Sequence, residues 1–398
     1  MQVLEQEKLE DQLKACIHCG MCLPACPTYQ VSHNEANSPR GRLYLINEHI
    51  KGSDLDKEKT VEYLDDCLSC YACETACPSN VDYADILDYA RHDLKLSNYS
   101  KNPIRKFFFA FLISNRSALR YMRRMLRTAK PFLKILMPLF GFGRQAKLLP
   151  KFTKYKTLKP GMQFFSKVEL DLEDEERTLN FALGCVMDTV YNQVHWDTIE
   201  VLNAFGYHVH ISRSDCCGSL ASHSGEFEIG TKQKEKFVQQ IQKENMTLVT
   251  NSAGCGAFLE NEDIKVIDFV TALKNAPYKP KMQSDEKILY HPACHLNHRQ
   301  GVSADYEDLL QTVAGLEIET VDNKDLCCGS AGFYNLIKPK IASEIGKLKI
   351  SEIKEKTAKT IVTANPGCMS QIQALLDKGY TVLHPASYLH TAINANDL

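Results

Sequence analysis

Apolar and polar positions in the second half of the chain follow two alternating patterns. Short apolar runs of strand length fall at 179–183, 207–211, 247–250, 287–290, 317–321 and 360–363. Stretches with helical spacing separate them, including 227–243 and 338–354. Strands that alternate with helices predict parallel sheets covered by helices. Because the same succession occurs twice, we expect two copies of one α/β unit.

The segment 101–168 has a different pattern. Phenylalanine, leucine and methionine interleave with basic residues, which predicts amphipathic helices with basic faces. The segment holds 17 Lys or Arg and no Asp or Glu, and since the whole chain carries −2, the remainder carries −19. Such a segment is typical of docking on anionic lipid or on an acidic partner subunit. The alternative is a helical linker that buries its apolar face.

The first hundred residues contain two nearly identical cysteine motifs, between expected helices at 1–15 and 83–96. They are Cys16-Ile-His-Cys19-Gly-Met-Cys22-Leu-Pro-Ala-Cys26-Pro27 and Cys67-Leu-Ser-Cys70-Tyr-Ala-Cys73-Glu-Thr-Ala-Cys77-Pro78. Both read C-x2-C-x2-C-x3-C-P, the spacing with which bacterial-type ferredoxins hold two [4Fe–4S] clusters. Three thiolates of each run ligate one cluster, and the fourth ligates the other. We therefore assign one cluster to Cys16, Cys19, Cys22 and Cys77, and the other to Cys67, Cys70, Cys73 and Cys26.

Other uses of these cysteines fit the sequence less well. A zinc site needs only two C-x2-C pairs. Disulfides need an oxidising compartment, whereas the sequence from Met1 is acidic and lacks the apolar core of a signal peptide. We expect a cytoplasmic protein whose 16 Cys are mainly metal ligands. The longest apolar runs, such as 107–113, are too short to span a bilayer.

Each α/β unit contains a single Cys, a Cys-Cys-Gly and a further Cys, in that order. The intervals are 31 and 38 residues in the first unit and 33 and 40 in the second. Each cysteine follows an expected strand, and ligands of open α/β sheets bind beyond the carboxyl ends of strands. We expect these thiols to hold one or two further Fe–S clusters, either one in each repeat or one shared, rather than to be small buried apolar groups. The candidates are Cys185, Cys216, Cys217, Cys255, Cys294, Cys327, Cys328 and Cys368.

A few charged and titratable side chains are additional candidates. Arg40 and Arg42, between the two cysteine motifs, would either favour a reduced cluster by Coulomb attraction or be solvated at a helix start. Four histidines near the later cysteines are either structural or part of a proton relay near a quinone. They are His195, His291, His295 and His298. The net charge of −2 predicts no nucleic-acid partner.

Together these motifs resemble the iron–sulfur subunit of bacterial glycolate oxidase almost from end to end. The matching stretches are Ala15 to Gln30, Pro39-Arg-Gly-Arg-Leu-Tyr-Leu-Ile46, Gly254-Cys-Gly-Ala-Phe258, Leu326-Cys-Cys-Gly-Ser-Ala-Gly332 and Ile361-Val-Thr-Ala-Asn365. The resemblance implies a mixed α+β and α/β fold. Its parts are a mostly helical two-[4Fe–4S] ferredoxin-like domain (1–98), a basic amphipathic helical linker (99–170) and two α/β Cys-Cys-Gly repeats (171–280 and 281–398).

The implied function is electron transfer within a membrane-associated glycolate oxidase. An FAD-containing partner subunit would oxidise glycolate to glyoxylate, and this chain would relay the electrons toward membrane quinone. No G-x-G-x-x-G follows a strand, so no substrate-oxidising or catalytic residue is expected on this chain. We expect it to lie peripherally on the inner face of the cell membrane.

Several alternatives share the same cysteine pattern. The chain would serve equally as the relay of a lactate or anaerobic glycerol-3-phosphate dehydrogenase, because substrate selection belongs to the flavin subunit. A heterodisulfide-reductase-like subunit is a second alternative, but that pattern ends in Cys-x2-Cys, whereas Phe258 follows Cys255 and Gln371 follows Cys368 at this spacing. A cluster-bearing sensor without catalytic flux is a third.

Overall fold

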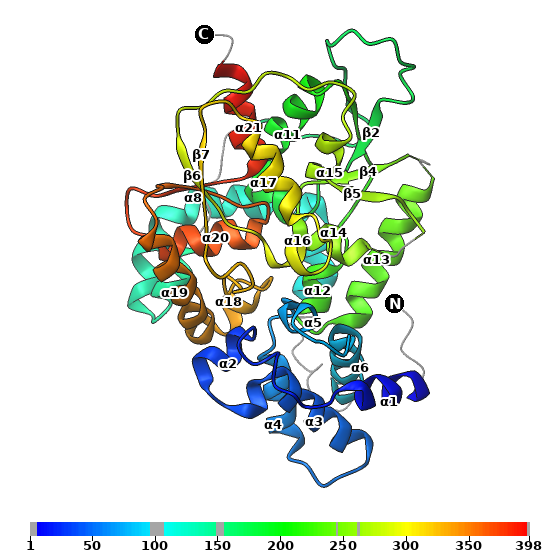
Figure 1. The fold of residues 1–398 in the computed structure, drawn as a ribbon, viewed down its shortest axis with the longest axis vertical. Helices are drawn as coiled ribbons and strands as arrows, with labels where there is room; N and C mark the ends of the chain where they lie inside the picture. The colour runs from blue at the N-terminus through cyan, green and yellow to red at the C-terminus, as the bar shows by residue number, and fades with distance from the viewer. Residues whose placement is uncertain (1–5, 96–106, 149–154, 244–245, 261–262, 396–398) are drawn as a thin grey trace.

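The computed structural model describes the chain except for residues 1–5, 96–106, 149–154, 244–245, 261–262 and 396–398. A helical N-terminal domain, blue in Figure 1, lies at one end of the molecule, and two parallel sheets with their helices form the rest. The expected α/β class and the helical ferredoxin-like domain are therefore both present.

Seven short helices wrap the two ferredoxin-type motifs. They are α1 (Gln6–Ala15), α2 (Pro27–Ser32), the 3-10 helix η1 (Glu35–Asn37), α3 (Pro39–Ile50), α4 (Lys57–Asp65), α5 (Ala72–Thr75) and α6 (Tyr83–Lys95). Ser38 caps α3 by accepting a hydrogen bond from the Gly41 N–H, and Asp56 caps α4 in the same way. Leu9, Ile46 and Ile86 are completely buried in a separate small core that holds the domain together.

The described residues of the basic segment include three helical elements. These are the π-helix η3 (Phe108–Ile113), the long α8 (Arg116–Leu139) and α9 (Gly143–Lys147). Asn115 caps α8 by accepting hydrogen bonds from the Ser117 and Ala118 N–H groups. The helices expected from the amphipathic pattern are present, whereas the π geometry of η3 was not predicted.

The first sheet has the order β1-β3-β2-β4-β5. Its strands are β1 (Gln163–Phe164), β2 (Thr178–Phe181), β3 (His208–Ile211), β4 (Leu248–Thr250) and β5 (Val266–Asp268). Only β1, at the edge, is antiparallel. The accompanying helices are α10 (Val186–Val190), α11 (Asn192–Ala204), α12 (Ser219–His223), α13 (Phe227–Gln242), α14 (Ala253–Leu259) and α15 (Phe269–Lys274).

The second sheet repeats this order as β7-β6-β8-β9, with every pair parallel. Its strands are β6 (Lys287–Tyr290), β7 (Glu317–Thr320), β8 (Thr360–Val362) and β9 (Thr381–Leu383). Its helices are α16 (Cys294–His298), α17 (Ser303–Gln311), α18 (Tyr334–Ile337), α19 (Pro339–Glu355), α20 (Pro366–Leu375) and α21 (Pro385–Asn394). The six strands expected from the sequence are all present, and β1, β5 and β9 are additional.

The two repeats pack directly against each other through equivalent loops. The Ala253 N–H, just after β4, donates to the Ala364 carbonyl, just after β8, at 3.2 Å. Helix α21 of the second repeat lies beside α11 of the first, near the top of Figure 1. His384 reaches across to the Asn251 carbonyl at 2.9 Å. One continuous apolar core runs through both sheets, so the repeats form a single body.

Candidate functional site

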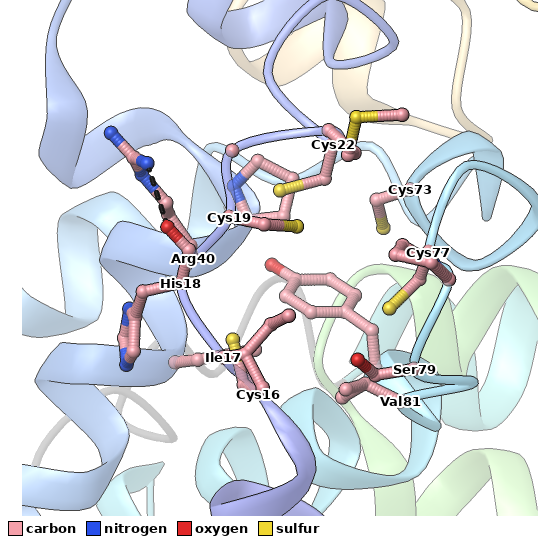
Figure 2. Close-up of a pocket in the computed structure, with 16 residues that line it drawn as sticks. Cys16, Ile17, His18, Cys19, Cys22, Arg40, Cys73, Cys77, Ser79 and Val81 are labelled. Carbon is pink, nitrogen blue, oxygen red and sulfur yellow. Dashed lines mark hydrogen bonds between the residues drawn. The ribbon is translucent and has the colours of Figure 1, made fainter.

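The first predicted ligand set lies around one cavity. Cys16, Cys19, Cys22 and Cys77 all line it, and Figure 2 shows their sulfur atoms pointing into a common space. Cys73 lies at the same wall. Cys19 is exposed, so one edge of this cavity reaches the protein surface.

The second predicted set lines a neighbouring cavity. Its thiols are those of Cys26, Cys67, Cys70 and Cys73. The fourth cysteine of each motif therefore lies with the first three of the other motif, as the spacing predicts. Cys73 lines both cavities and forms part of the wall between them. The geometry brings both sets together, and their role as cluster ligands stays a prediction.

The two motifs fold into loops with the same local conformation. His18 and Gly20 have positive φ angles of 54° and 84°, and the equivalent Ser69 and Tyr71 have 50° and 64°. These left-handed positions are strained for residues with a Cβ atom, and they persist where the surroundings require them. Here they turn three successive cysteines of each loop toward one space.

Buried donors surround the sulfur atoms of the second set. Arg42 is 1% exposed, and its guanidinium approaches Cys26 Sγ at 4.0 Å and Thr28 Oγ1 at 3.0 Å. Tyr83 directs its hydroxyl at Cys67 Sγ, 3.7 Å away. Burial acts to lower the pKa of Arg42, but the nearby ionisable Tyr83 and Cys67 raise it overall, so the guanidinium stays charged. Such donors favour negative charge on the sulfur atoms.

Arg40 lies at the first cavity instead. Its guanidinium donates to the His18 carbonyl at 3.0 Å, the bond drawn in Figure 2, and to Glu35 at 2.6 Å. The hydrogen bond with Arg40 lowers the pKa of Glu35. The structure therefore places the two arginines of the Pro-Arg-Gly-Arg turn at different cavities, the more exposed one at the first and the buried one at the second.

The donor chemistry of both cavities fits an iron–sulfur cluster. Burial raises the pKa of Cys22 to about 11 and raises that of Cys70 and Cys73 well above the usual thiol value. Thiolates at these positions need compensating positive charge, which the irons of a cluster supply. In the described part of the chain, no group of three or more His, Cys, Asp or Glu side chains is arranged to hold one metal ion.

In the first repeat, four thiols form two close pairs beyond the strand ends. Cys216 Sγ lies 3.5 Å from Cys185 Sγ, and Cys217 Sγ lies 3.4 Å from Cys255 Sγ. A cavity beside Cys217 and Cys255 is lined by Gly184 and Asn251. The chain passes from β2 to β3 on one side and then to β4 on the other, and such switch points are where parallel sheets bind ligands.

The second repeat repeats this arrangement. Cys328 Sγ lies 3.2 Å from Cys368 Sγ, and Asn365 Nδ2 donates to the latter sulfur at 3.5 Å. Hydrogen bonds from Cys294 and Cys328 hold the pKa of Cys327 well below its usual value. The thiols thus group within each repeat rather than across the two. Of the sequence alternatives, one group per repeat agrees with this geometry.

Glycines allow each Cys-Cys-Gly turn to approach a helix closely. Gly218 has a φ of 95°, and a Cβ there would lie 2.2 Å from the Gly230 carbonyl oxygen in α13. Gly329 has a φ of 83°, and its Cβ would lie 2.5 Å from the Ala342 carbonyl oxygen in α19. The helix glycines Gly230 and Gly346 were not predicted, because isolated glycines inside helical patterns carry no distinctive signal.

The second cluster cavity adjoins the thiols of the second repeat. Burial, followed by the charge of Cys327, raises the pKa of Cys70 well above the usual thiol value. Leu68, Cys70, Cys327 and Cys368 share one core. The contact is reinforced by Thr75 Oγ1 and His298 Nδ1, which lie 2.9 Å apart. An ion pair between Lys338 and Asp66 adds a further link.

Tyr71 and His223, which the sequence did not single out, lie at this junction. The Tyr71 ring packs edge-on against His295, with centroids 5.4 Å apart, and the His223 ring lies 5.3 Å from the same imidazole. Both are held there by tertiary contacts between distant segments, which leave no local pattern in the sequence.

The histidine candidates are buried and neutral. Burial lowers the pKa of His195 and His295 to about 4 and that of His291 to about 3. His298, less deeply buried, shifts in the same direction. A group that stays neutral down to such pH values does not gain a proton near neutrality. These side chains therefore favour the structural interpretation over the proton relay.

The two positions that depart from the heterodisulfide reductase pattern have packing roles. Lys234 Nζ lies 4.8 Å from the centre of the Phe258 ring. Gln371 accepts a hydrogen bond from Asn335 at 3.0 Å and donates to the Ala342 carbonyl at 3.1 Å. Neither position adds a thiol to its group.

Two family models match the chain. The 4Fe-4S dicluster domain matches residues 12–81, and the cysteine-rich domain matches residues 179–260 and 288–373. These matches confirm the expected iron–sulfur clusters and the pair of Cys-Cys-Gly repeats. Among the helices of the described residues, none is long and apolar enough to cross a bilayer.

Curated proteins similar to the chain cover nearly its whole length. The probable glycolate oxidase iron-sulfur subunit of Bacillus subtilis is 30% identical, over 93% of this chain and 90% of the relative. The glycolate oxidase iron-sulfur subunit of Escherichia coli is also 30% identical, over 90% and 89%. A component of the dihydromethanophenazine:CoB–CoM heterodisulfide reductase of Methanosarcina acetivorans is 21% identical, over 90% and 87%. The chain belongs to the family of glycolate oxidase iron–sulfur subunits and is an iron–sulfur electron-transfer subunit.

Proposed function

We propose that this chain carries electrons from an FAD-containing partner that oxidises glycolate to glyoxylate, and delivers them toward a membrane quinone. Oxidation of glycolate releases two electrons and two protons, which the partner's flavin takes up. Bound clusters pass electrons one at a time, and a quinone that takes up two electrons and two protons becomes a quinol. The chain's own residues hold and separate the carriers.

The observation that carries this proposal is the succession of adjoining thiol groups. The first cavity shares Cys73 with the second, and Cys70 of the second belongs to the same core as Cys327 of the second repeat, close enough for the charge of Cys327 to add to the effect of burial in raising its pKa. Three groups of thiols thus follow one another, which supports a succession of three binding sites. A relay needs this closeness, whereas a sensor needs only one site.

Within this relay, positive charges and hydrogen-bond donors near the sulfur atoms would set the reduction potential of each cluster. Arg42 and Tyr83 place positive charge and a hydroxyl donor beside buried sulfur atoms, which stabilises added negative charge there. The first cavity reaches the surface at Cys19 and is the natural contact point for a soluble partner subunit. In the second cavity Cys26 and Cys70 are buried, which limits the access of water to these two sulfur atoms.

The test uses the complex purified without air, together with its flavin subunits. Glycolate, D-lactate, L-lactate and glycerol 3-phosphate are offered in turn, and cluster reduction and reduction of a soluble quinone analogue are followed. Rapid reduction by glycolate is the expected result. Preference for another substrate would replace glycolate and keep the relay. Intact clusters that no substrate reduces, with the flavin subunit present, would reject the proposal.

A further inference from the structure

The outer face of α8 carries large apolar side chains exposed to solvent. Phe132, Ile135 and Leu139 are 69%, 67% and 75% exposed. They are spaced three and four residues apart and therefore lie on one face of the helix. Tyr121, Met125 and Leu136 extend the same face, and Phe140 and Phe142 continue it beyond the helix end. We call these eight residues the apolar stripe.

Exposed basic side chains flank the apolar stripe. Arg124 borders the stripe on α8, the exposed Arg127 and Lys134 lie further round the helix, and Arg144 follows on α9. No Asp or Glu occurs anywhere between residues 101 and 168. An exposed apolar face of this size marks an interaction surface rather than ordinary scatter.

The opposite side of α8 is fixed to the first repeat. Leu119 is buried against η3 and α12, in a core that also contains Cys185 and Cys216. Arg120 forms an ion pair with Asp188 of α10 at 3.3 Å and donates to the Leu158 carbonyl at 3.0 Å. The helix is therefore held against the protein by its N-terminal half, while Figure 1 shows the cyan-to-teal ribbon reaching the edge of the molecule.

Charge distinguishes an anionic bilayer from a second copy of this chain as the occupant of this stripe. An interfacial helix on a bilayer places apolar side chains among the upper acyl chains and basic side chains at anionic headgroups. The apolar stripe, its basic flank and the complete lack of acidic residues match this description. A second copy of the chain would bring two basic faces together, which is unfavourable.

We propose that the apolar stripe of α8 docks on the surface of an anionic lipid bilayer, with Arg124, Arg127, Lys134 and Arg144 at lipid phosphates. The inference deepens the proposed function, because it names the surface on which the quinone would be met. The N-terminal half of the same helix covers Cys185 and Cys216 of the first repeat through Leu119.

Vesicle binding tests this surface directly. The purified complex is sedimented with phosphatidylcholine vesicles, with and without phosphatidylglycerol, at low and high salt. We expect binding only with phosphatidylglycerol and weakening by salt, since screening shortens the range of the attraction. Equal binding to both vesicle types, or to neither, would overturn the proposal.

Two variants and a matched control localise the binding. The charge variant combines Arg124→Glu, Arg127→Glu and Lys134→Glu, and the stripe variant combines Phe132→Ser, Ile135→Ser and Leu139→Ser. Each should weaken binding by about tenfold or more, because basic residues and buried apolar groups both contribute. The control combines Lys340→Glu, Lys347→Glu and Lys378→Glu, which changes the charge equally at exposed positions elsewhere and should bind like the native chain.

Other outcomes distinguish a failure of the membrane-docking proposal from a failure of the proposed function. If the variants bind vesicles normally but lose the flavin subunit on gel filtration, the stripe is a protein interface and the proposal fails. Glycolate-dependent cluster reduction in detergent solution should be unchanged in both variants. A complex that binds anionic vesicles but is not reduced by glycolate would reject the function and keep the surface.

Discussion

The two Cys-Cys-Gly repeats have the same strand order and the same paired thiols, but they have different neighbours. Three thiols of the second repeat, those of Cys327, Cys328 and Cys368, share one core with Cys70 of the second cluster cavity, and the charge of Cys327 adds to the effect of burial in raising the pKa of Cys70. Cys185 and Cys216 of the first repeat are covered by Phe109, Ile113 and Leu119 of the basic segment. One motif therefore faces a cysteine loop in one copy and an apolar helical cover in the other.

The difference suggests a direction for the relay. The second repeat has a ferredoxin-type thiol beside it, as expected of a site that receives electrons from the N-terminal domain. The thiols of the first repeat lie under η3 and the start of α8, the helix whose far half carries the stripe proposed to meet the bilayer. The two repeats thus have equivalent thiol groups with different neighbours, and under the proposed relay these neighbours would give them different roles.

The most severe test of this comparison is Cys70→Ala. We expect the iron content to fall by one cluster, with loss of glycolate-dependent reduction at both repeats, because the link to the second repeat is removed. The α/β repeats should stay folded by circular dichroism. The matched variant Cys185→Ala should leave both ferredoxin-type clusters reducible. Full iron content and turnover in Cys70→Ala would contradict the ligand assignment.

The repeats should also respond to pH in opposite directions. Asp268 ends β5 and accepts from the Val270 N–H, and His384 follows β9 and accepts from the Ala386 N–H, so the two cap equivalent helices. Burial raises the pKa of Asp268 to about 6 and lowers that of His384 to about 3. Folding thus favours protonated Asp268 and neutral His384.

The sign follows from which state binds more protons. For Asp268, stability is lost as pH rises from about 4 to about 6, by an amount on the order of 3 kcal/mol. For His384, stability is lost as pH falls below about 6.5. Thermal unfolding of the variants Asp268→Asn and His384→Gln should be measured across pH 4 to 8. Asp268→Asn should lose the decrease in stability that the native protein shows as pH rises from about 4 to about 6. His384→Gln should lose the decrease that it shows below about pH 6.5. Parallel profiles for all three proteins would refute the assignment.

The glycine of each Cys-Cys-Gly turn should be costly to replace. Gly218→Ala and Gly329→Ala both add strain at positive φ and a Cβ too close to a helix carbonyl, so each should lower stability by about 2 kcal/mol or more. Gly379→Ala is the control, because its φ is also positive but its Cβ meets nothing within 4 Å. It should show the conformational cost alone. Denaturant unfolding measures the difference, and equal losses at all three positions would show that the close helix contact contributes nothing.

The smallest expected effect is a shift in potential. Arg42→Gln removes a buried positive charge beside Cys26, so the second cluster should become harder to reduce, by on the order of 60 mV, equivalent to about 1.4 kcal/mol. Redox titration followed by electron paramagnetic resonance measures it. The reduction potential measured for the first repeat should not change, and Arg42→Lys should shift the potential of the second cluster by less than Arg42→Gln does. An unchanged potential in Arg42→Gln would remove this residue from the tuning of the site.

Local patterns predicted much of this architecture. Alternating apolar runs located six strands, and 287–290 coincides with β6. Motif spacing placed Cys77 with the first loop and Cys26 with the second, which the cavities reproduce. Both predictions depend on short-range regularities that are fixed by strand geometry and cluster geometry.

Features that depend on distant contacts could not be predicted in this way. Tyr71 reaches its place beside His295 only because α5 packs on α16, more than two hundred residues later in the chain. Strand β1 is two residues long and forms only because His210 and Val209 offer an edge to it. The neighbours that distinguish the two repeats belong to this class, so the sequence predicted the repeats and not their different roles.

The exposed position of Cys19 has a consequence for how oxidation would inactivate the protein. Ile17 and Met21 beside it are 69% and 61% exposed, whereas Cys26 and Cys70 of the second cavity are buried. Oxidants should therefore reach the Cys19 sulfur before the buried ones, because susceptibility to oxidation follows exposure. Under the proposed relay, damage by air would begin at the site that meets the partner subunit and would disconnect that subunit before the buried thiols are attacked.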